Sequence, residues 1–265
     1  MRWHSKLGNF FPSKNIHRGS LLGRVEAARK EIEMRKRLSI ILILVGLVPP
    51  LVCLYPLRLQ ASELNIDPSH TAFLILHYQN DIVHPTKDAF GGAYSKRIAE
   101  AKNIEHTKAV LDECRKKGIL VIHTAFAMRK GAPEIADKPS PLFSAFKKAG
   151  VLVEGTWGAD FYDTLKPVGT EPVVVHASKN AFWGTDLDII LHARGITDVV
   201  MAGIATAHFV ILATTLSASD RQYYPVILED CCNDASDDLH NWILQNVLKD
   251  IAVITDSKTF INSLR

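Results

Sequence analysis

Histidines follow several short apolar runs of this chain, at points where a side chain would leave a strand. His77, His123 and His176 each directly follow such a run, and His208 lies in the segment after another. An imidazole can give or take a proton near neutral pH, so these residues are candidates for acid–base catalysis. His77, His176 and His208 are also the candidate ligands for zinc, copper or haem iron. They lack a local spacing such as H-x-x-x-H, so a structural role stays open for each.

The elements that would position these residues alternate between apolar runs and amphipathic stretches, which is the pattern of β-α-β units. Right-handed crossovers then predict an α/β fold, a three-layer α/β/α doubly wound sandwich with a mostly parallel central sheet. Ligands of such sheets bind beyond the carboxyl ends of the strands, so the histidines are expected at one edge. The predicted strands cover residues 72–76, 119–122, 173–175, 199–202, 225–228 and 251–254. The predicted helices cover residues 94–117, 185–194, 207–220 and 237–249.

Charge divides the chain into two parts. Residues 1–61 contain 11 Lys and Arg against 3 Asp and Glu, a formal charge of +8. Residues 62–265 carry a formal charge of −5, which argues against nucleic acid as a partner of the larger part. We therefore expect a basic N-terminal segment, residues 1–61, followed by one domain, residues 62–265.

An uncharged apolar stretch, residues 38–57, follows three consecutive basic residues of the N-terminal segment. Pro49-Pro50 shortens its apolar core to the length found in signal peptides, and Ala61 ends a tolerable cleavage tripeptide. We expect either a cleaved signal peptide or a membrane anchor, so that residues 1–61 contact the membrane or the secretion machinery. Either outcome places the domain outside the cytoplasm, in the periplasm or secreted. The alternative is that the protein is cytosolic and that residues 38–57 form a buried hydrophobic helix.

Four short motifs occur in series along the domain: LHYQND at 76–81, GTWGA at 155–159, AFWGTDL at 181–187 and GIAT at 203–206. Their order and spacing resemble the isochorismatase-like superfamily of cysteine hydrolases, which includes nicotinamidases and other amide hydrolases. The resemblance spans residues 72–265 and implies the same isochorismatase-like α/β/α sandwich.

The resemblance also implies where the reactive residues of such hydrolases would lie. Most members use a Cys nucleophile, an Asp that takes its proton and a Lys that supports the pair. In this sequence the Asp position is His77, the Lys position is His176 and the Cys position is Phe209. Phenylalanine has no nucleophilic atom, so we expect a divergent member that forms no acyl-enzyme at this position.

The sequence therefore predicts a hydrolase-fold protein that acts on a small molecule outside the cytoplasm without a cysteine nucleophile. His77 and His176 are its expected acid–base or polarising groups. No cofactor is needed for this chemistry, and the resemblance implies a homo-oligomer. Two alternatives stay open: a catalytically inactive, small-ligand-binding pseudoenzyme, and a metal- or haem-binding protein built on the histidine cluster. The predicted substrate pocket comprises His123, Trp157, Phe182, Ala205, His208 and Phe209.

Overall fold

The structure is a computed structural model that describes Glu26 and residues 29–34 and 64–264. The chain separates into two compact units, Met1–Gln60 and Ala61–Arg265. Within the first unit, residues 29–34 are helical and exposed. The predicted signal or anchor stretch, residues 38–57, lies outside the described residues. Among the helices of the described part, none is both long and apolar enough to cross a membrane.

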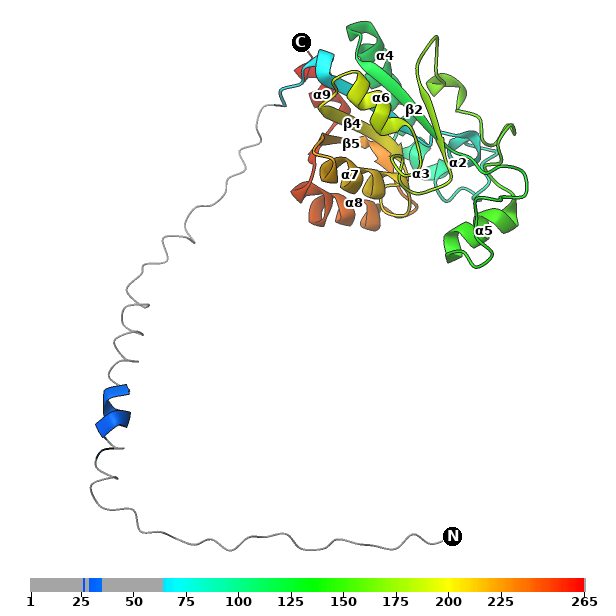
Figure 1. The fold of residues 1–265 in the computed structure, drawn as a ribbon. Coiled ribbons are helices and arrows are strands. Elements are labelled where there is room, and N and C mark those ends of the chain that lie inside the picture. The colour runs from blue at the N-terminus through cyan, green and yellow to red at the C-terminus, as the bar shows by residue number, and fades with distance from the viewer. Residues whose placement is uncertain (1–25, 27–28, 35–63, 265) are drawn as a thin grey trace, which may run out of the picture. The chain divides into compact units, whose positions relative to one another are not determined.

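A six-stranded sheet lies at the centre of the second unit, in the order β3-β2-β1-β4-β5-β6 (Figure 1). All five strand pairings are parallel, which confirms the predicted mostly parallel sheet. Every residue of β1 is buried, as expected for a central strand covered on both faces. The strands are β1 (Thr71–Leu76), β2 (Leu120–Phe126), β3 (Val173–His176), β4 (Asp198–Ile204), β5 (Tyr224–Asn233) and β6 (Val253–Thr255).

Helices cover both faces of this sheet and complete the predicted α/β/α sandwich (Figure 1). On one face α4 (Asn103–Lys117) packs against α9 (Ser257–Ser263). The right-handed crossovers through α6 (Leu187–Ala193), α7 (Val210–Asp220) and α8 (Asp237–Asn246) place those helices on the other face. The shorter helices are α2 (Asn80–Val83), α3 (Ser95–Glu100), α5 (Pro141–Ala149), η1 (Pro68–His70), η2 (Asp163–Leu165) and η3 (Leu248–Asp250).

The helix predicted over residues 94–117 is in fact two helices, α3 and α4. Lys102 adopts a left-handed backbone conformation, with φ of 54°, which ends the first helix and redirects the chain. Asn103 then begins α4 with an amide that donates to the carbonyl oxygens of Asp230 (2.7 Å) and Cys232 (3.0 Å). The start of α4 is therefore set by a contact with β5, which helical periodicity does not report.

A buried glutamine fastens the carboxyl ends of two central strands. The Gln79 amide donates to the carbonyl oxygens of Phe126 (2.9 Å) and Ala159 (2.7 Å), and it accepts from the Phe126 N–H (2.9 Å). These bonds join the end of β1, the end of β2 and the loop that carries the GTWGA motif. This edge of the sheet is where the candidate site lies.

Candidate functional site

His77 and His176 meet at the carboxyl-terminal edge of the sheet. His77 follows β1 and His176 ends β3, and their Nε2 atoms lie 3.0 Å apart. The backbone of His77 is left-handed, with φ of 61°, so the chain turns sharply as it leaves the strand. Both rings are shielded from solvent, since His77 is 0% and His176 is 5% exposed. The structure thus brings together two of the four candidate histidines.

Hydrogen bonding assigns the protons of this histidine pair. His176 Nδ1 lies 3.0 Å from the carbonyl oxygen of Ser178, which can only accept, so Nδ1 donates. In the neutral ring His176 Nε2 is then an acceptor, and His77 Nε2 must donate to it. His77 Nδ1 remains as a buried lone pair with no partner among the described residues. The pair is a neutral dyad with one free basic nitrogen.

Burial keeps both imidazoles uncharged. Desolvation lowers the pKa of His176 to about 4, even though its bond to Ser178 acts in the opposite direction. Desolvation also holds the pKa of His77 well below its usual range, and the neighbouring His176 lowers it further. The dyad can therefore accept a hydrogen bond but resists accepting a full charge.

Phe209 stands at the position where the resemblance places a nucleophile, immediately before α7. Its ring centroid lies 4.9 Å from that of His77, 5.2 Å from Phe126 and 5.7 Å from Phe146. The side chain is buried and belongs to the aromatic core of the edge. The position therefore supports packing and supplies no reactive atom.

A small cavity adjoins Phe209, with a volume of about 20 Å³. This is room for about one water molecule, whereas sites for small ligands typically measure roughly 300–1,000 Å³. Three residues of the predicted pocket line it, namely Ala205, His208 and Phe209. Neither His77 nor His176 does, because the Phe209 ring that lines the cavity also packs on His77.

A buried carboxylate, Asp234, holds the loop before α7. Its Oδ2 accepts from the backbone N–H groups of Ala207 (2.7 Å) and His208 (3.1 Å), and its Oδ1 accepts from His208 Nδ1 (2.5 Å). Asp234 is 0% exposed, whereas the His208 side chain is 51% exposed. Two N–H groups beside the helix start, where an oxyanion would be stabilised, are thus occupied by the protein's own carboxylate.

Sequence reasoning did not single out Asp234. The predicted strand ends at residue 228, whereas β5 extends to Asn233 and so brings Asp234 to the ligand edge.

His123 faces the opposite side of the sheet. His123 and Phe126 are three residues apart on β2, so their side chains point to opposite faces. His123 Nε2 lies 2.9 Å from Glu171 Oε2, and Arg115 Nε lies 2.7 Å from Oε1 of the same carboxylate. Burial lowers the pKa of His123, and Glu171 acts in the opposite direction. The expectation that His123 lines the pocket is therefore corrected, because strand alternation turns it away.

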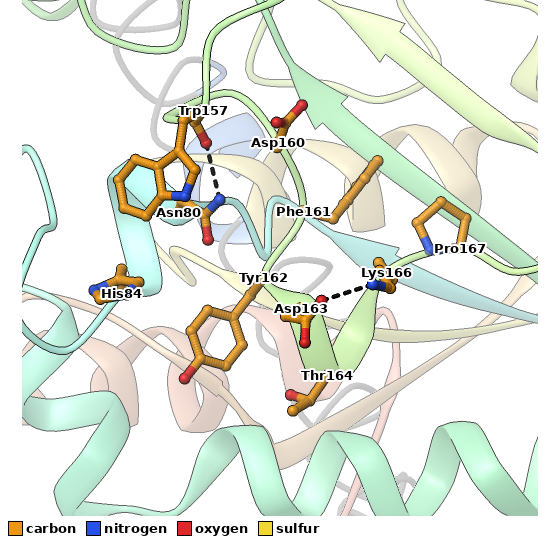
Figure 2. A pocket seen from close by; sticks show the side chains of 10 residues that line it. All are labelled: Asn80, His84, Trp157, Asp160, Phe161, Tyr162, Asp163, Thr164, Lys166 and Pro167. Atoms are coloured by element: carbon orange, nitrogen blue, oxygen red, sulfur yellow. Dashed lines mark hydrogen bonds and ion pairs between the residues drawn. The ribbon is translucent and has the colours of Figure 1, made fainter.

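Trp157 and Phe182 also lie outside the cavity beside Phe209, because their loops contribute to other surfaces. Phe182 stacks on Tyr223 with ring centroids 5.8 Å apart. Trp157 lines a separate open cleft of about 670 Å³, which Figure 2 shows. In that view its indole stands beside His84, with ring centroids 5.1 Å apart. The predicted pocket is thus divided, and these two aromatic side chains do not wall the His77 edge.

The three histidines considered as metal ligands fall into two separate groups. The Nε2 atoms of His77 and His176 face each other, while His208 Nδ1 bonds Asp234. Within the described ranges no set of three or more potential ligands is arranged to hold a metal ion. The free thiols of the described domain are buried and none lines the cavity: Cys114, Cys231 and Cys232.

Comparison with known proteins agrees with the fold and the motifs. The isochorismatase domain model matches residues 71–259. The ureidoacrylate amidohydrolase RutB of Rhizobium rhizogenes is 28% identical over 191 residues, covering 68% of this chain and 76% of the relative. RutB of Acinetobacter baylyi is 26% identical over 223 residues, covering 79% of this chain and 89% of the relative.

Solved structures show the same fold. A cysteine hydrolase from Pseudomonas syringae superposes with a TM-score of 0.66 at 19% identity, covering 76% of this chain and 94% of that chain. N-carbamoylsarcosine amidase from Thermoplasma acidophilum gives a TM-score of 0.55 at 21% identity, covering 71% and 96% respectively. With the domain model matched across residues 71–259, the chain belongs to the isochorismatase family.

Proposed function

We propose that this isochorismatase-family protein hydrolyses a small acyl compound by direct attack of water, without a covalent enzyme intermediate. The observation that carries this proposal is the Phe209 ring, packed on His77 where a nucleophile is expected. A benzyl group cannot attack a carbonyl carbon. Residues 203–216 contain neither cysteine nor serine, so a shift of register supplies no substitute.

The names of the similar proteins suggest which class of small compound to test first. The RutB proteins that this chain resembles are named for hydrolysing ureidoacrylate, a small compound with a ureido group. Small ureas and amides therefore come first among the candidates, followed by esters and enol ethers.

His77 and His176 are the acid–base or polarising groups that the sequence suggests for this reaction. One observation supports them, the free lone pair on His77 Nδ1. The Phe209 ring separates the pair from the cavity, so substrate or water reaches Nδ1 only when that ring turns aside. Their role predicts that His77→Ala and His176→Ala each abolish turnover.

The experiment is a hydrolysis screen of the purified full chain against ureas, amides, esters and enol ethers in ¹⁸O-labelled water. We expect turnover without an initial burst, and an intact mass that is unchanged during turnover. A cysteine-containing relative treated in the same way is the control, and it should show the acyl adduct. A burst together with a stable adduct on this protein would contradict the proposal.

A second candidate function is a small-ligand-binding pseudoenzyme. It is favoured by Asp234, whose carboxylate occupies the N–H groups of Ala207 and His208 where a hydrolase would stabilise an oxyanion. Ligand-dependent thermal stabilisation with no turnover of any compound in the screen would select this candidate.

We further propose that the domain acts outside the cytoplasm. The support is the uncharged stretch at residues 38–57, the basic residues before it and the small residue Ala61 after it.

A further inference from the structure

We propose that His208, oriented by Asp234, is the base that activates water in this protein, an inference that rests on the proposed noncovalent hydrolysis. The two residues come from different elements, since His208 precedes α7 and Asp234 follows β5. His208 Nδ1 lies 2.5 Å from Asp234 Oδ1. An imidazole that a buried carboxylate holds at one nitrogen presents the other nitrogen as a general base.

The carboxylate that orients His208 is itself firmly held. Asp234 is 0% exposed and accepts backbone N–H groups of Ala207 (2.7 Å), His208 (3.1 Å) and Ala235 (2.7 Å). Because an ionised carboxylate can only accept, His208 Nδ1 carries the proton of this hydrogen bond. In the neutral ring the lone pair is therefore on Nε2. Asp234 is a positioning residue in this arrangement, since it acts through the imidazole.

His208 Nε2 is accessible, unlike the nitrogens of the buried pair at His77. The His208 side chain is 51% exposed and lines the cavity beside Phe209, and its Nε2 has no hydrogen-bond partner in the described part of the chain. Tyr94 lines the same cavity. Burial, with a contribution from Asp234, raises the pKa of the Tyr94 hydroxyl to about 12, so this group stays protonated and can donate to a developing oxyanion.

The proposed reaction conserves all atoms and electrons. Water gives a proton to His208 Nε2 while its oxygen forms a bond to the substrate carbonyl carbon, and the carbonyl π electrons move to oxygen. The tetrahedral intermediate then re-forms the carbonyl and expels the leaving group with its bonding pair. The imidazolium returns the proton to the leaving group, so the products are an acid and an alcohol or amine, and the protein is unchanged.

The cavity restricts the acyl part of the substrate. Its volume of about 20 Å³ and its apolar walls, which include Phe90, Leu142 and Phe146, suit a short apolar group no larger than methyl. The leaving group would remain at the solvent-exposed side of His208. The site therefore fits an acetyl-sized ester or amide, and p-nitrophenyl acetate is a suitable probe.

The test compares p-nitrophenyl acetate hydrolysis by the full chain with that by His208→Ala and Asp234→Asn. We expect His208→Ala to lower kcat/KM about 100-fold. His192→Ala is the matched control, because His192 is 69% exposed and lies 3.6 Å from Asp188 but does not line the cavity. It should retain the wild-type rate.

Asp234→Asn tests positioning by a spectroscopic signature as well as by rate. The introduced amide can donate to Nδ1, which favours the tautomer of His208 with its proton on Nε2. The ¹⁵N chemical shifts of the His208 ring should show this change, and kcat/KM should fall about tenfold or more. If the Asp234→Asn variant does not fold, the His208→Ala comparison decides alone.

Two results would overturn the assignment of His208: equal rates in wild type and His208→Ala, or no wild-type rate above buffer. A trapped acetyl group on the protein would instead contradict the noncovalent function as a whole.

Discussion

At the scale of single residues, the main difference from the cysteine hydrolases is Phe209. This side chain packs in the core at the position where the resemblance places the Cys nucleophile. Phe209 is 6% exposed and contacts both His77 and Phe126. Edge and face contacts between such rings stabilise a core beyond simple burial. The residue therefore contributes to stability at a place where related hydrolases are expected to carry out chemistry.

Phe209→Cys should restore a thiol without restoring an amidase. The Asp and the Lys that support the thiol in cysteine hydrolases would still be absent, because His77 and His176 stand at their positions, so the variant should hydrolyse no amide faster than wild type. Loss of the ring should lower the free energy of unfolding by about 3 kcal/mol, measured by urea denaturation. Amide turnover created by this change alone would refute the assignment of the pocket.

Phe182→Cys is the matched control for that variant. Phe182 is also buried but stacks on Tyr223, away from the cavity. Both variants should lose stability, but only Phe209→Cys should be stabilised by a small apolar guest such as benzene, because only that change enlarges the cavity.

Acid should destabilise the domain through His77 and His176. Both pKa values are lower in the folded state than the ordinary value of 6.5, and that of His176 is about 4. Between pH 4 and pH 6.5 the unfolded chain binds more protons than the folded chain. The contribution of these histidines to the free energy of unfolding is therefore fully present above pH 6.5 and is lost as the pH drops toward 4. Each such group can contribute up to about 1.4 kcal/mol per pH unit.

Urea unfolding at several pH values between 7 and 4.5 would measure this slope. His123 and His240 also have lowered pKa values, so the informative quantity is the difference between wild type and His176→Asn. The variant should show the shallower slope. Parallel curves would contradict the role of the buried pair.

Part of the site could be predicted from single residues, and part could not. His77 follows β1 and His176 ends β3, with β2 between these two strands, and the carboxyl ends of parallel strands meet at one edge of the sheet. The pairing of His208 with Asp234 depends on how two loops fold back, which neither residue type nor spacing indicates. His123 was misplaced because the strand predicted to end at residue 122 continues to Phe126, so His123 lies within β2 and faces away from the site.

At the scale of elements, β1 and β4 approach closely at Gly203. A Cβ atom at this position would lie 2.7 Å from Leu76 Cβ and 2.8 Å from the Leu76 carbonyl oxygen. Gly203→Ala should therefore force the two strands apart and lower the free energy of unfolding by roughly 1–3 kcal/mol. Chemical denaturation measures the effect, and an unchanged midpoint would show that the strands separate without cost.

Elements with a strong apolar pattern were predictable, whereas their interruptions were not. The runs at residues 72–76 and 199–202 correspond to the buried central strands, because both faces of a covered parallel sheet are apolar. The break at Lys102 was missed, because it depends on a left-handed residue and on the bonds of Asn103 to β5. Helical spacing continues across that break in the sequence.

At the scale of the whole molecule, the sequence combines a basic, apolar N-terminal segment with the hydrolase-fold domain. Alkaline phosphatase fused after Arg265 should be active if residues 62–265 are exported, because that reporter requires an oxidising compartment. The matched control deletes residues 38–57 and should abolish reporter activity. An active control, or an inactive full-length fusion that is well expressed, would contradict export.

The carboxylate of Asp234 also bears on inhibitor selectivity. Boronates and phosphonates are designed to imitate the anionic tetrahedral species of acyl hydrolases, and they depend on unoccupied backbone donors. Here the N–H groups of Ala207 and His208 already donate to that carboxylate, so such a warhead would find neither of these donors available. Drugs aimed at thiol amidases of this fold should therefore spare this protein.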